Sequence, residues 1–366
     1  MKAKVFFIDL HVTRGKNLQQ KLVRLVKAAG IDRVDFDKKF VAIKVHFGEP
    51  GNLAYLRPNY AKTLVDLVKE RGGRPFLTDC NTLYVGGRKN ALDHLDSAYL
   101  NGFSPFSTGC HVLIADGLKG TDEVLVPVEG GEHVKEAKIG RAIMDADIVI
   151  SLNHFKGHEL TGFGGALKNI GMGSGSRAGK MEMHSAGKPS VNHEACIGCG
   201  VCAENCAHNA ITVEEKATID QAICTGCGRC LSVCPVDAVE PASDESVEIL
   251  NKKIAEYTWA VLHGRPHFHI NMVIDVSPFC DCYGGNDIPI VPDVGMFASF
   301  DPVALDVACA DAVNKQPVIA GSELAKCHRT HGDYFTDIYP ETNWRSAIDH
   351  AVKLGLGQKE YELITV

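Results

Sequence analysis

The feature that most constrains the fold of this 366-residue chain is a cysteine run with the spacing C-x2-C-x2-C-x3-C, which occurs twice. The first run consists of Cys196, Cys199, Cys202 and Cys206. The second run lies 28 positions later and consists of Cys224, Cys227, Cys230 and Cys234. The segment Asn209-Ala210-Ile211 maps onto Asp237-Ala238-Val239 with the same offset. The two halves are therefore an internal duplication, and residues 186–241 are predicted to form one small module.

The spacing within each run suits a [4Fe–4S] cubane. Three thiolates must reach three corners of one cluster, so the chain between them has to turn tightly, which glycines beside the cysteines permit. These glycines are Gly198, Gly200, Gly226 and Gly228. In two-cluster bacterial ferredoxins the fourth cysteine of each run ligates the other cluster. We therefore predict one cluster on Cys196, Cys199, Cys202 and Cys234, and a second on Cys224, Cys227, Cys230 and Cys206. Ile211 and Val239 are expected to pack over them.

Zinc sites and disulfides are the alternatives for these eight cysteines. Structural zinc sites prefer two C-x2-4-C pairs per metal, whereas this chain has two runs of four. The start of the chain reads as a first strand interrupted by Asp9, with no small-residue cleavage site after it, so we expect a cytoplasmic protein. Disulfides are unfavourable in that compartment. The net charge of −7 argues against a nucleic-acid or anionic-membrane partner, and no apolar run approaches the ~20 residues of a membrane helix.

Outside the cysteine module, strand and helix patterns alternate, which predicts an α/β fold with a doubly wound, mostly parallel sheet. Strands are expected at 4–8, 41–47, 75–79, 111–116, 147–153 and 267–276. Helices are expected at 18–29, 59–71, 88–101, 135–145, 245–262, 302–314 and 344–354.

The domain organisation follows from where this alternation stops. The Gly/Ser-rich residues 171–180 are predicted to be a flexible connection. We therefore expect one α/β domain, formed by residues 1–185 and 242–366, into which the α+β two-cluster module of residues 186–241 is inserted. Two α/β halves that flank the module are the alternative.

Candidate site residues follow the predicted strands, because ligands of doubly wound sheets bind at the carboxyl ends of the strands. Thiols, imidazoles and carboxylates at such ends could hold an additional metal ion or act as redox thiols. The candidates are His46, Cys80, His154, Lys156, His158, Glu159, Cys280 and Cys282. The structural alternatives are a half-buried strand histidine at His46 and a small core residue at Cys80.

A glycine-rich stretch between residues 162 and 171 could cradle an anion with backbone N–H groups at a helix start. Gly164 and Gly165 lie at its centre, and Lys156 and Lys168 add positive charge nearby. The stretch is neither a P-loop nor a dinucleotide-binding fingerprint. The alternative is a glycine-rich turn that packs under the cysteine module.

Two segments resemble a known family. They are Asn153–Asn169 (NHFKGHELTGFGGALKN) and Asp301–Asp306 (DPVALD), and they resemble the hallmark of the uncharacterised family catalogued as domain of unknown function 362. The resemblance extends over most of the chain, and members of that family commonly carry an inserted or appended ferredoxin module. It implies an iron–sulfur protein of anaerobic-type metabolism with no settled reaction.

A fainter similarity links the chain to nickel-pincer lactate racemases. These have a histidine, a Gly-x-x-Gly-Gly stretch and a cofactor-linked lysine. The matching residues here would be His154 or His158, Gly164-Gly165 and Lys168, with the lysine one residue later than in that pattern.

We therefore expect an iron–sulfur redox protein whose clusters pass electrons to or from a site at the strand ends, which would make it an oxidoreductase. The expected partner is a redox protein or a small-molecule substrate. An anionic group would bind to Lys156, Lys168, Gly164 and Gly165. The catalytic candidates are His154, His158 and Glu159, which would handle protons, and Lys168. Cys280 and Cys282 would be redox thiols or metal ligands, with Cys80 and His46 as further candidates. A non-redox, isomerase-like enzyme with structural clusters and a pure electron carrier are the competing functions.

Overall fold

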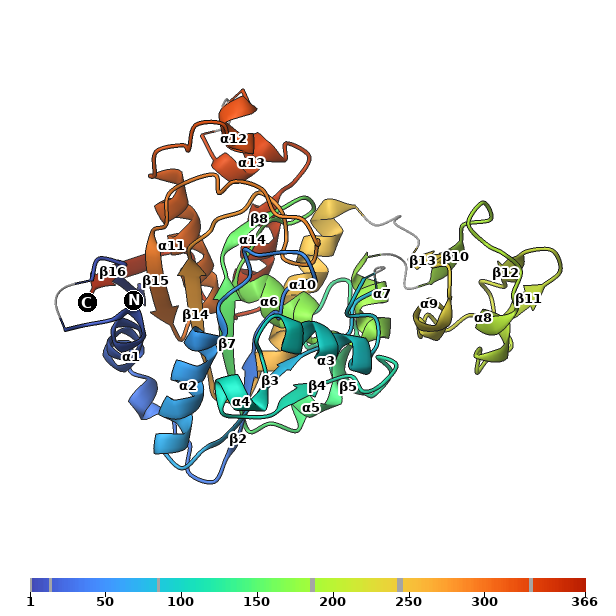
Figure 1. Cartoon of the computed structure of the whole chain (residues 1–366), viewed down its shortest axis with the longest axis horizontal. Coiled ribbons are helices and arrows are strands. Elements are labelled where there is room, and N and C mark those ends of the chain that lie inside the picture. Colours follow the sequence, from blue (N-terminus) through green and yellow to red (C-terminus); the bar gives the residue numbers. More distant parts are fainter. Residues whose placement is uncertain (1, 13–14, 84–85, 185–187, 242–245, 329–331) are drawn as a thin grey trace.

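The chain folds around an eight-stranded sheet in the order β16-β1-β15-β14-β7-β2-β3-β4 (Figure 1). The computed structural model describes residues 2–12, 15–83, 86–184, 188–241, 246–328 and 332–366. The strands are β16 (Tyr361–Thr365), β1 (Ala3–Ile8), β15 (Gly295–Ser299), β14 (His267–Val273), β7 (Ile148–His154), β2 (Phe40–Lys44), β3 (Arg74–Asp79) and β4 (Val112–Ile114). All neighbouring pairs are parallel except those of β15, which runs antiparallel to β1 and β14. The predicted mostly parallel α/β sheet is confirmed.

Helices cover both faces of the sheet because successive strand residues point to opposite sides. Ile150 of β7 belongs to the core under α1 (Leu18–Ala28) and α2 (Pro58–Glu70). Its neighbour Val149 belongs to the opposite core, under α10 (Val247–Leu262) and α6 (Ala166–Ser174). On this second face α11 (Pro302–Asn314) and α14 (Trp344–Lys353) pack further along the sheet. The sheet is therefore doubly wound, as predicted.

Two predicted segments differ from the structure. Residues 135–145 are not a helix: β6 (Glu136–Gly140) pairs with β5 (Glu123–Pro127), and only α5 (Arg141–Met144) is helical. Residues 171–180 are not a flexible connection, since α6 and α7 (Arg177–His184) run through them. Their glycines serve close packing: a β-carbon at Gly171 would lie 2.2 Å from the Ile254 carbonyl oxygen of α10. Small residues thus let α6 press against α10.

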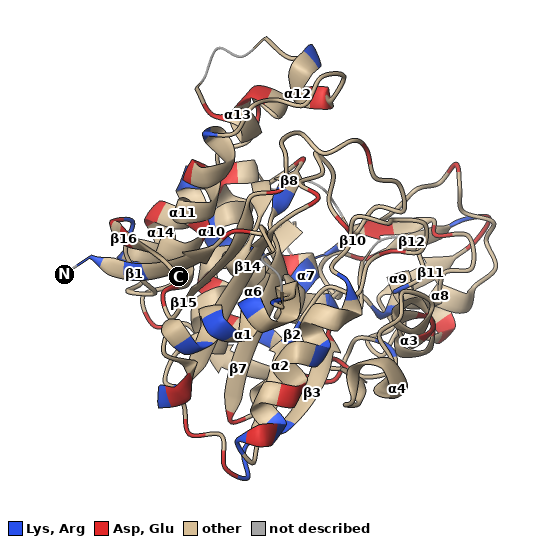
Figure 2. Ribbon diagram, turned by 60° about the vertical axis from the view of Figure 1, so that its left-hand side comes forward, with Lys and Arg blue, Asp and Glu red and all other residues tan. Residues whose placement is uncertain are grey.

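The remaining elements complete the edges of the α/β part. They are η1 (Ile31–Arg33), α3 (Ala91–Leu100), α4 (Pro105–Thr108), the hairpin of β8 (Lys156–His158) and β9 (Gly162–Gly164), α12 (Glu323–Lys326) and α13 (Tyr334–Ile338). Basic and acidic residues are interspersed over the ribbon (Figure 2). No helix of the described residues is long and apolar enough to cross a membrane.

The cysteine module stands at one end of the long axis of the molecule (Figure 1). It contains β10 (Pro189–Val191), α8 (Val201–Glu204), β11 (Ile211–Val213), β12 (Ala217–Ile219), α9 (Arg229–Val233) and β13 (Val239–Pro241). The strands that enter and leave it, β10 and β13, pair antiparallel. The predicted boundaries at 185/186 and 241/242 fall on or beside residues outside the described ranges.

Candidate functional site

A cavity lies at the carboxyl ends of β2, β3, β7 and β14, where the sequence placed its candidates. It encloses about 960 Å³ of space, part of it open to solvent. The predicted residues that line it are His46, Cys80, His154, Lys156, His158, Glu159, Gly164, Gly165, Lys168 and Cys282. Cys280 adjoins it through Lys156. The strand ends thus bring residues from four separate segments to one place.

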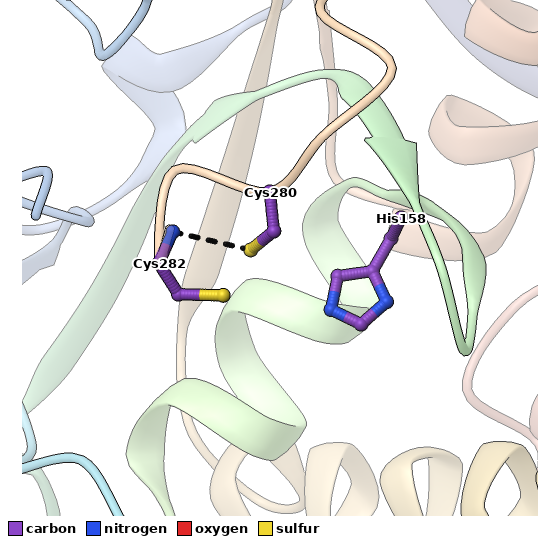
Figure 3. A group of neighbouring side chains, drawn as sticks. All are labelled: His158, Cys280 and Cys282. Atoms are coloured by element: carbon purple, nitrogen blue, oxygen red, sulfur yellow. Dashed lines mark hydrogen bonds between the residues drawn. The ribbon is translucent and has the colours of Figure 1, made fainter. Parts of the chain in front are cut away.

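Cys280 and Cys282 lie on the loop after β14 and face His158 of β8 (Figure 3). The two sulfur atoms and a ring nitrogen of His158 lie within 4.8 Å of one another. Among the described residues this is the only group of three or more histidine, cysteine or acidic side chains close enough to hold one metal ion. His46 and Cys80 line the same cavity, but they do not belong to this group of possible metal ligands.

The buried Lys156 and the partly buried Lys168 lie beside the sulfur of Cys280. Lys156 Nζ lies 3.2 Å and Lys168 Nζ 3.5 Å from Cys280 Sγ. Burial alone would raise the pKa of the Cys280 thiol, but the Cys282 hydrogen bond and the two ammonium charges outweigh it and hold that pKa well below its usual range. The same hydrogen bond and burial raise the pKa of Cys282. These surroundings therefore favour the thiolate at Cys280 over a thiolate at Cys282.

His158 is neutral and held by the backbone. Its Nδ1 accepts the N–H groups of Leu160 at 3.1 Å and Thr161 at 3.2 Å. Burial and the charge of Lys168 lower the pKa of the ring. Since Nδ1 accepts, the proton of the neutral ring is on Nε2. Glu159, the next residue, has a side chain that is 52% exposed and sits at the cavity rim.

His154 has both ring nitrogens occupied. Nδ1 lies 2.9 Å from the Asp281 carboxylate, and Nε2 lies 2.8 Å from the Ile274 carbonyl oxygen. Burial opposes the charged ring, but the Asp281 carboxylate raises the pKa of His154. Both partners are acceptors, so His154 is an imidazolium that ties β7 to the Cys280–Cys282 loop. No role was predicted for Asp281 from the sequence, because its partner lies 127 residues away.

A second buried charge network, also missed from the sequence, fixes His46. Arg88 donates to Glu49 Oε2 at 2.7 Å and lies 2.8 Å from His46 Nε2. Burial and the Arg88 charge lower the pKa of His46 to about 3, so the ring is neutral. The buried thiol of Cys80 donates to the Ser174 carbonyl oxygen at 3.3 Å, and burial raises its pKa. Cys80 therefore matches the alternative of a small core residue.

Two N–H groups beside the glycine-rich stretch are already occupied by a carboxylate of the chain. The N–H groups of Ala166 and Leu167, at the start of α6, donate to the Asp306 carboxylate at 2.7 and 3.0 Å. A β-carbon at Gly165 would lie 2.3 Å from Asp306 Oδ1, so glycine allows this close approach. The chain's own carboxylate thus occupies two N–H groups at this helix start, and the anion site at Gly164 and Gly165 stays a prediction. The two lysines keep positive charge in the cavity.

The eight cysteines of the module line two small cavities. One is bordered by Cys196, Cys199, Cys202 and Cys234, together with Val239. The other is bordered by Cys206, Cys224, Cys227 and Cys230, together with Ile211. All four glycines beside the cysteines have positive φ, between 66° and 79°. Each cavity therefore combines three cysteines of one run with the fourth cysteine of the other.

The module touches the wall of the large cavity. Leu83 lines that cavity and also packs in the core of the module, with Met181 and the cysteines. Lys89, next to Arg88, donates to the Cys234 carbonyl oxygen at 3.2 Å. The aliphatic part of Arg177 packs on Gly228, where a β-carbon would lie 2.8 Å from Arg177 Cγ.

Comparisons with known proteins give one family and remote structural similarity. A solved structure from Thermotoga maritima, a structural genomics target, is 16% identical and has a TM-score of 0.36; the match covers 70% of this chain and 50% of that one. The lactate racemase apoprotein from Thermoanaerobacterium thermosaccharolyticum is 12% identical with a TM-score of 0.38, over 100% of this chain and 83% of that one. No curated protein matches. The family model described as Domain of unknown function (DUF362) matches residues 41–311, which is more than half of the chain, and the chain therefore belongs to that family.

Proposed function

We propose that this chain is an iron–sulfur redox protein whose module holds two [4Fe–4S] clusters and whose cavity is the site that exchanges electrons with them. The observation that carries the proposal is the grouping of the eight cysteines into two cavities, each with three ligands from one run and one from the other. In two-cluster bacterial ferredoxins, too, the fourth cysteine of each run ligates the cluster of the other run.

Hydrogen bonds to the cysteine sulfurs support the assignment. The Ala210 N–H donates to Cys206 Sγ at 3.3 Å, and the Ala238 N–H donates to Cys234 Sγ at 3.2 Å. These two pairs occupy equivalent places in the duplicated runs. Backbone donors to thiolate ligands stabilise their negative charge and tune the potential of a bound cluster.

The spacing of the sulfurs disfavours zinc as the occupant. Four thiolates around one zinc ion, with Zn–S bonds of about 2.3 Å, lie about 3.8 Å apart. Among the described residues, no three of the eight cysteines lie within 4.8 Å of one another. Thiolates that bind different irons of a cubane stand farther apart, so this spacing suits a cubane better than a zinc ion.

The position of the module supports electron exchange with the cavity. Leu83 contacts both, and the neighbours Arg88 and Lys89 face the cavity and the module respectively. When bound, two clusters would supply one electron each, which suits a two-electron reaction in the cavity. We propose the inserted-module organisation, residues 186–241 within 1–185 and 242–366, on the pairing of β10 with β13.

The cavity itself would bind a small anionic substrate. Lys156 and Lys168 place two ammonium groups beside Cys280, and Lys180 also lines the wall. Neutral His158 would exchange a proton with the substrate through Nε2. His154 would position the thiol loop, because its nitrogens are already engaged by Asp281 and Ile274.

The proposal is tested by the metal content of anaerobically purified protein. We expect about eight iron and eight acid-labile sulfide per chain, with visible charge-transfer absorption that dithionite bleaches. Cys230→Ser should lower the iron content, whereas Cys327→Ser, at a cysteine outside the module, should leave it unchanged. Stoichiometric zinc without visible absorption would refute the proposal.

A further inference from the structure

We infer that Cys280 and Cys282 form a reversible intramolecular disulfide and so provide a two-electron centre inside the cavity. The inference deepens the proposed function and rests on it only for the source of the electrons. Disulfide exchange with an added thiol can test it independently of the clusters.

The loop geometry brings the two sulfurs together. The Tyr283 N–H donates to the Cys280 carbonyl oxygen at 3.0 Å and closes a turn over residues 280–283. The Cys282 N–H donates to Cys280 Sγ at 3.4 Å, and both side chains point to the same side of the loop (Figure 3). The sulfurs already lie within 4.8 Å of each other. Rotation of the two side chains on this turn would bring the sulfurs toward the S–S bond length of about 2.05 Å.

The charges around Cys280 disfavour the competing use of the pair as metal ligands. A cation bound at Cys280 Sγ would sit beside the ammonium groups of Lys156 and Lys168, at 3.2 and 3.5 Å from that sulfur. Like charges at such distances in a buried site repel strongly. His158 would also have to give up the Nε2 proton while Nδ1 still accepts two backbone N–H groups. The same surroundings stabilise a thiolate.

The redox step balances with the groups present. On reduction the S–S bond breaks and two electrons enter. The Cys280 sulfur leaves as a thiolate, held by Lys156 and Lys168, and the Cys282 sulfur takes up one proton. On oxidation by a disulfide such as glutathione disulfide, the Cys280 thiolate attacks one glutathione sulfur, forms a mixed disulfide and displaces one glutathione thiolate. Cys282 then loses its proton and attacks the Cys280 sulfur of the mixed disulfide, which displaces the second glutathione and closes the internal S–S bond.

The test uses the full-length protein equilibrated anaerobically with mixtures of reduced and oxidised glutathione. Free thiols are then alkylated, and the peptide that carries residues 280–282 is analysed by mass spectrometry. We expect it to change between two alkylated thiols and one internal disulfide in a single two-electron transition. Cys327→Ser should behave as the wild type, and Cys282→Ser should show no internal disulfide.

Two results would overturn the inference. One is a peptide with two free thiols at every glutathione ratio. The other is stoichiometric zinc binding by the cluster-loaded protein that is lost in His158→Ala, which would assign the pair to a metal. The measurement on the wild type decides the question even if a variant does not fold. Iron and sulfide measured on the same samples report on the proposed clusters separately, so failure of one idea is distinguishable from failure of the other.

Discussion

Replacement of Asp306 by asparagine should remove a defined part of the pH dependence of stability. The Asp306 carboxylate is buried and accepts hydrogen bonds from Ala166, Leu167 and the Asn271 side chain at 2.7–3.0 Å. Burial nevertheless dominates and raises its pKa from 3.8 to about 6. Between these two values the folded chain keeps a proton that the unfolded chain has released.

The magnitude follows from proton linkage. Because the folded state binds more protons, stability from this group is present at low pH and is lost as pH rises through about 6. One pKa unit corresponds to 1.36 kcal/mol. Between pH 5 and pH 7 the wild type should therefore lose about 1.3 kcal/mol through Asp306. Asp306→Asn has no such titration and should not lose it.

Urea unfolding of both proteins at pH 5 and pH 7 under anaerobic conditions measures this difference. Comparison with the variant cancels the titration of all other groups. Asp349→Asn, an exposed aspartate on α14, is the control and should follow the wild type. If the free energy of unfolding changed equally in the wild type and in Asp306→Asn from pH 5 to pH 7, the reasoning would be refuted. Ionisation of the buried Asp306 carboxylate would then cost nothing.

Three further outcomes are expected. Lys156→Met should raise the pKa of Cys280, since a buried opposite charge is worth about one to three pKa units. Alkylation of the Cys280 peptide by iodoacetamide should therefore be slower at neutral pH. An unchanged pH profile of alkylation would exclude Lys156 as the cause of the lowered Cys280 pKa. Cys206→Ser should damage the cluster held mainly by the second run and Cys234→Ser the cluster held by the first, as resolved by electron paramagnetic resonance; damage confined to each residue's own run would contradict crossed ligation. Deletion of residues 186–241 with a short linker should leave a cooperatively unfolding α/β domain, whereas aggregation would make the module part of the main core.

The sequence predicted most of the sheet because buried strands and amphipathic helices carry strong periodic signals. The prediction of helices and strands failed where the local periodic signal was weak or was misread. In β6, Ala137 and Ile139 are buried with Lys138 between them, a period of two that the helix prediction overlooked. The short strand β15 has buried residues throughout, so it shows no alternation. Glycine-rich α6 looked flexible, although its glycines allow close helix packing.

The candidate site was predictable in position and only partly in role. The rule that ligands bind at strand ends brought His46, His154 and the cysteine pair to one cavity. The partners that decide charge lie far away in the chain. Asp281 holds His154 as an imidazolium, and Asp306 occupies the helix start that the glycines seemed to offer to an anion. Such pairings depend on tertiary contacts, which a single sequence does not display.

The central claim is that the clusters and the cavity share electrons. The number of electrons that each chain takes up tests it most directly. Protein oxidised with glutathione disulfide and freed of excess reagent is titrated anaerobically with dithionite. The wild type should take up about four electrons per chain, two at the clusters and two at the Cys280–Cys282 disulfide. Cys280→Ser should take up about two, and Cys327→Ser about four. Uptake of about two electrons by the wild type and by Cys280→Ser alike would contradict the account, because the cavity would then receive none.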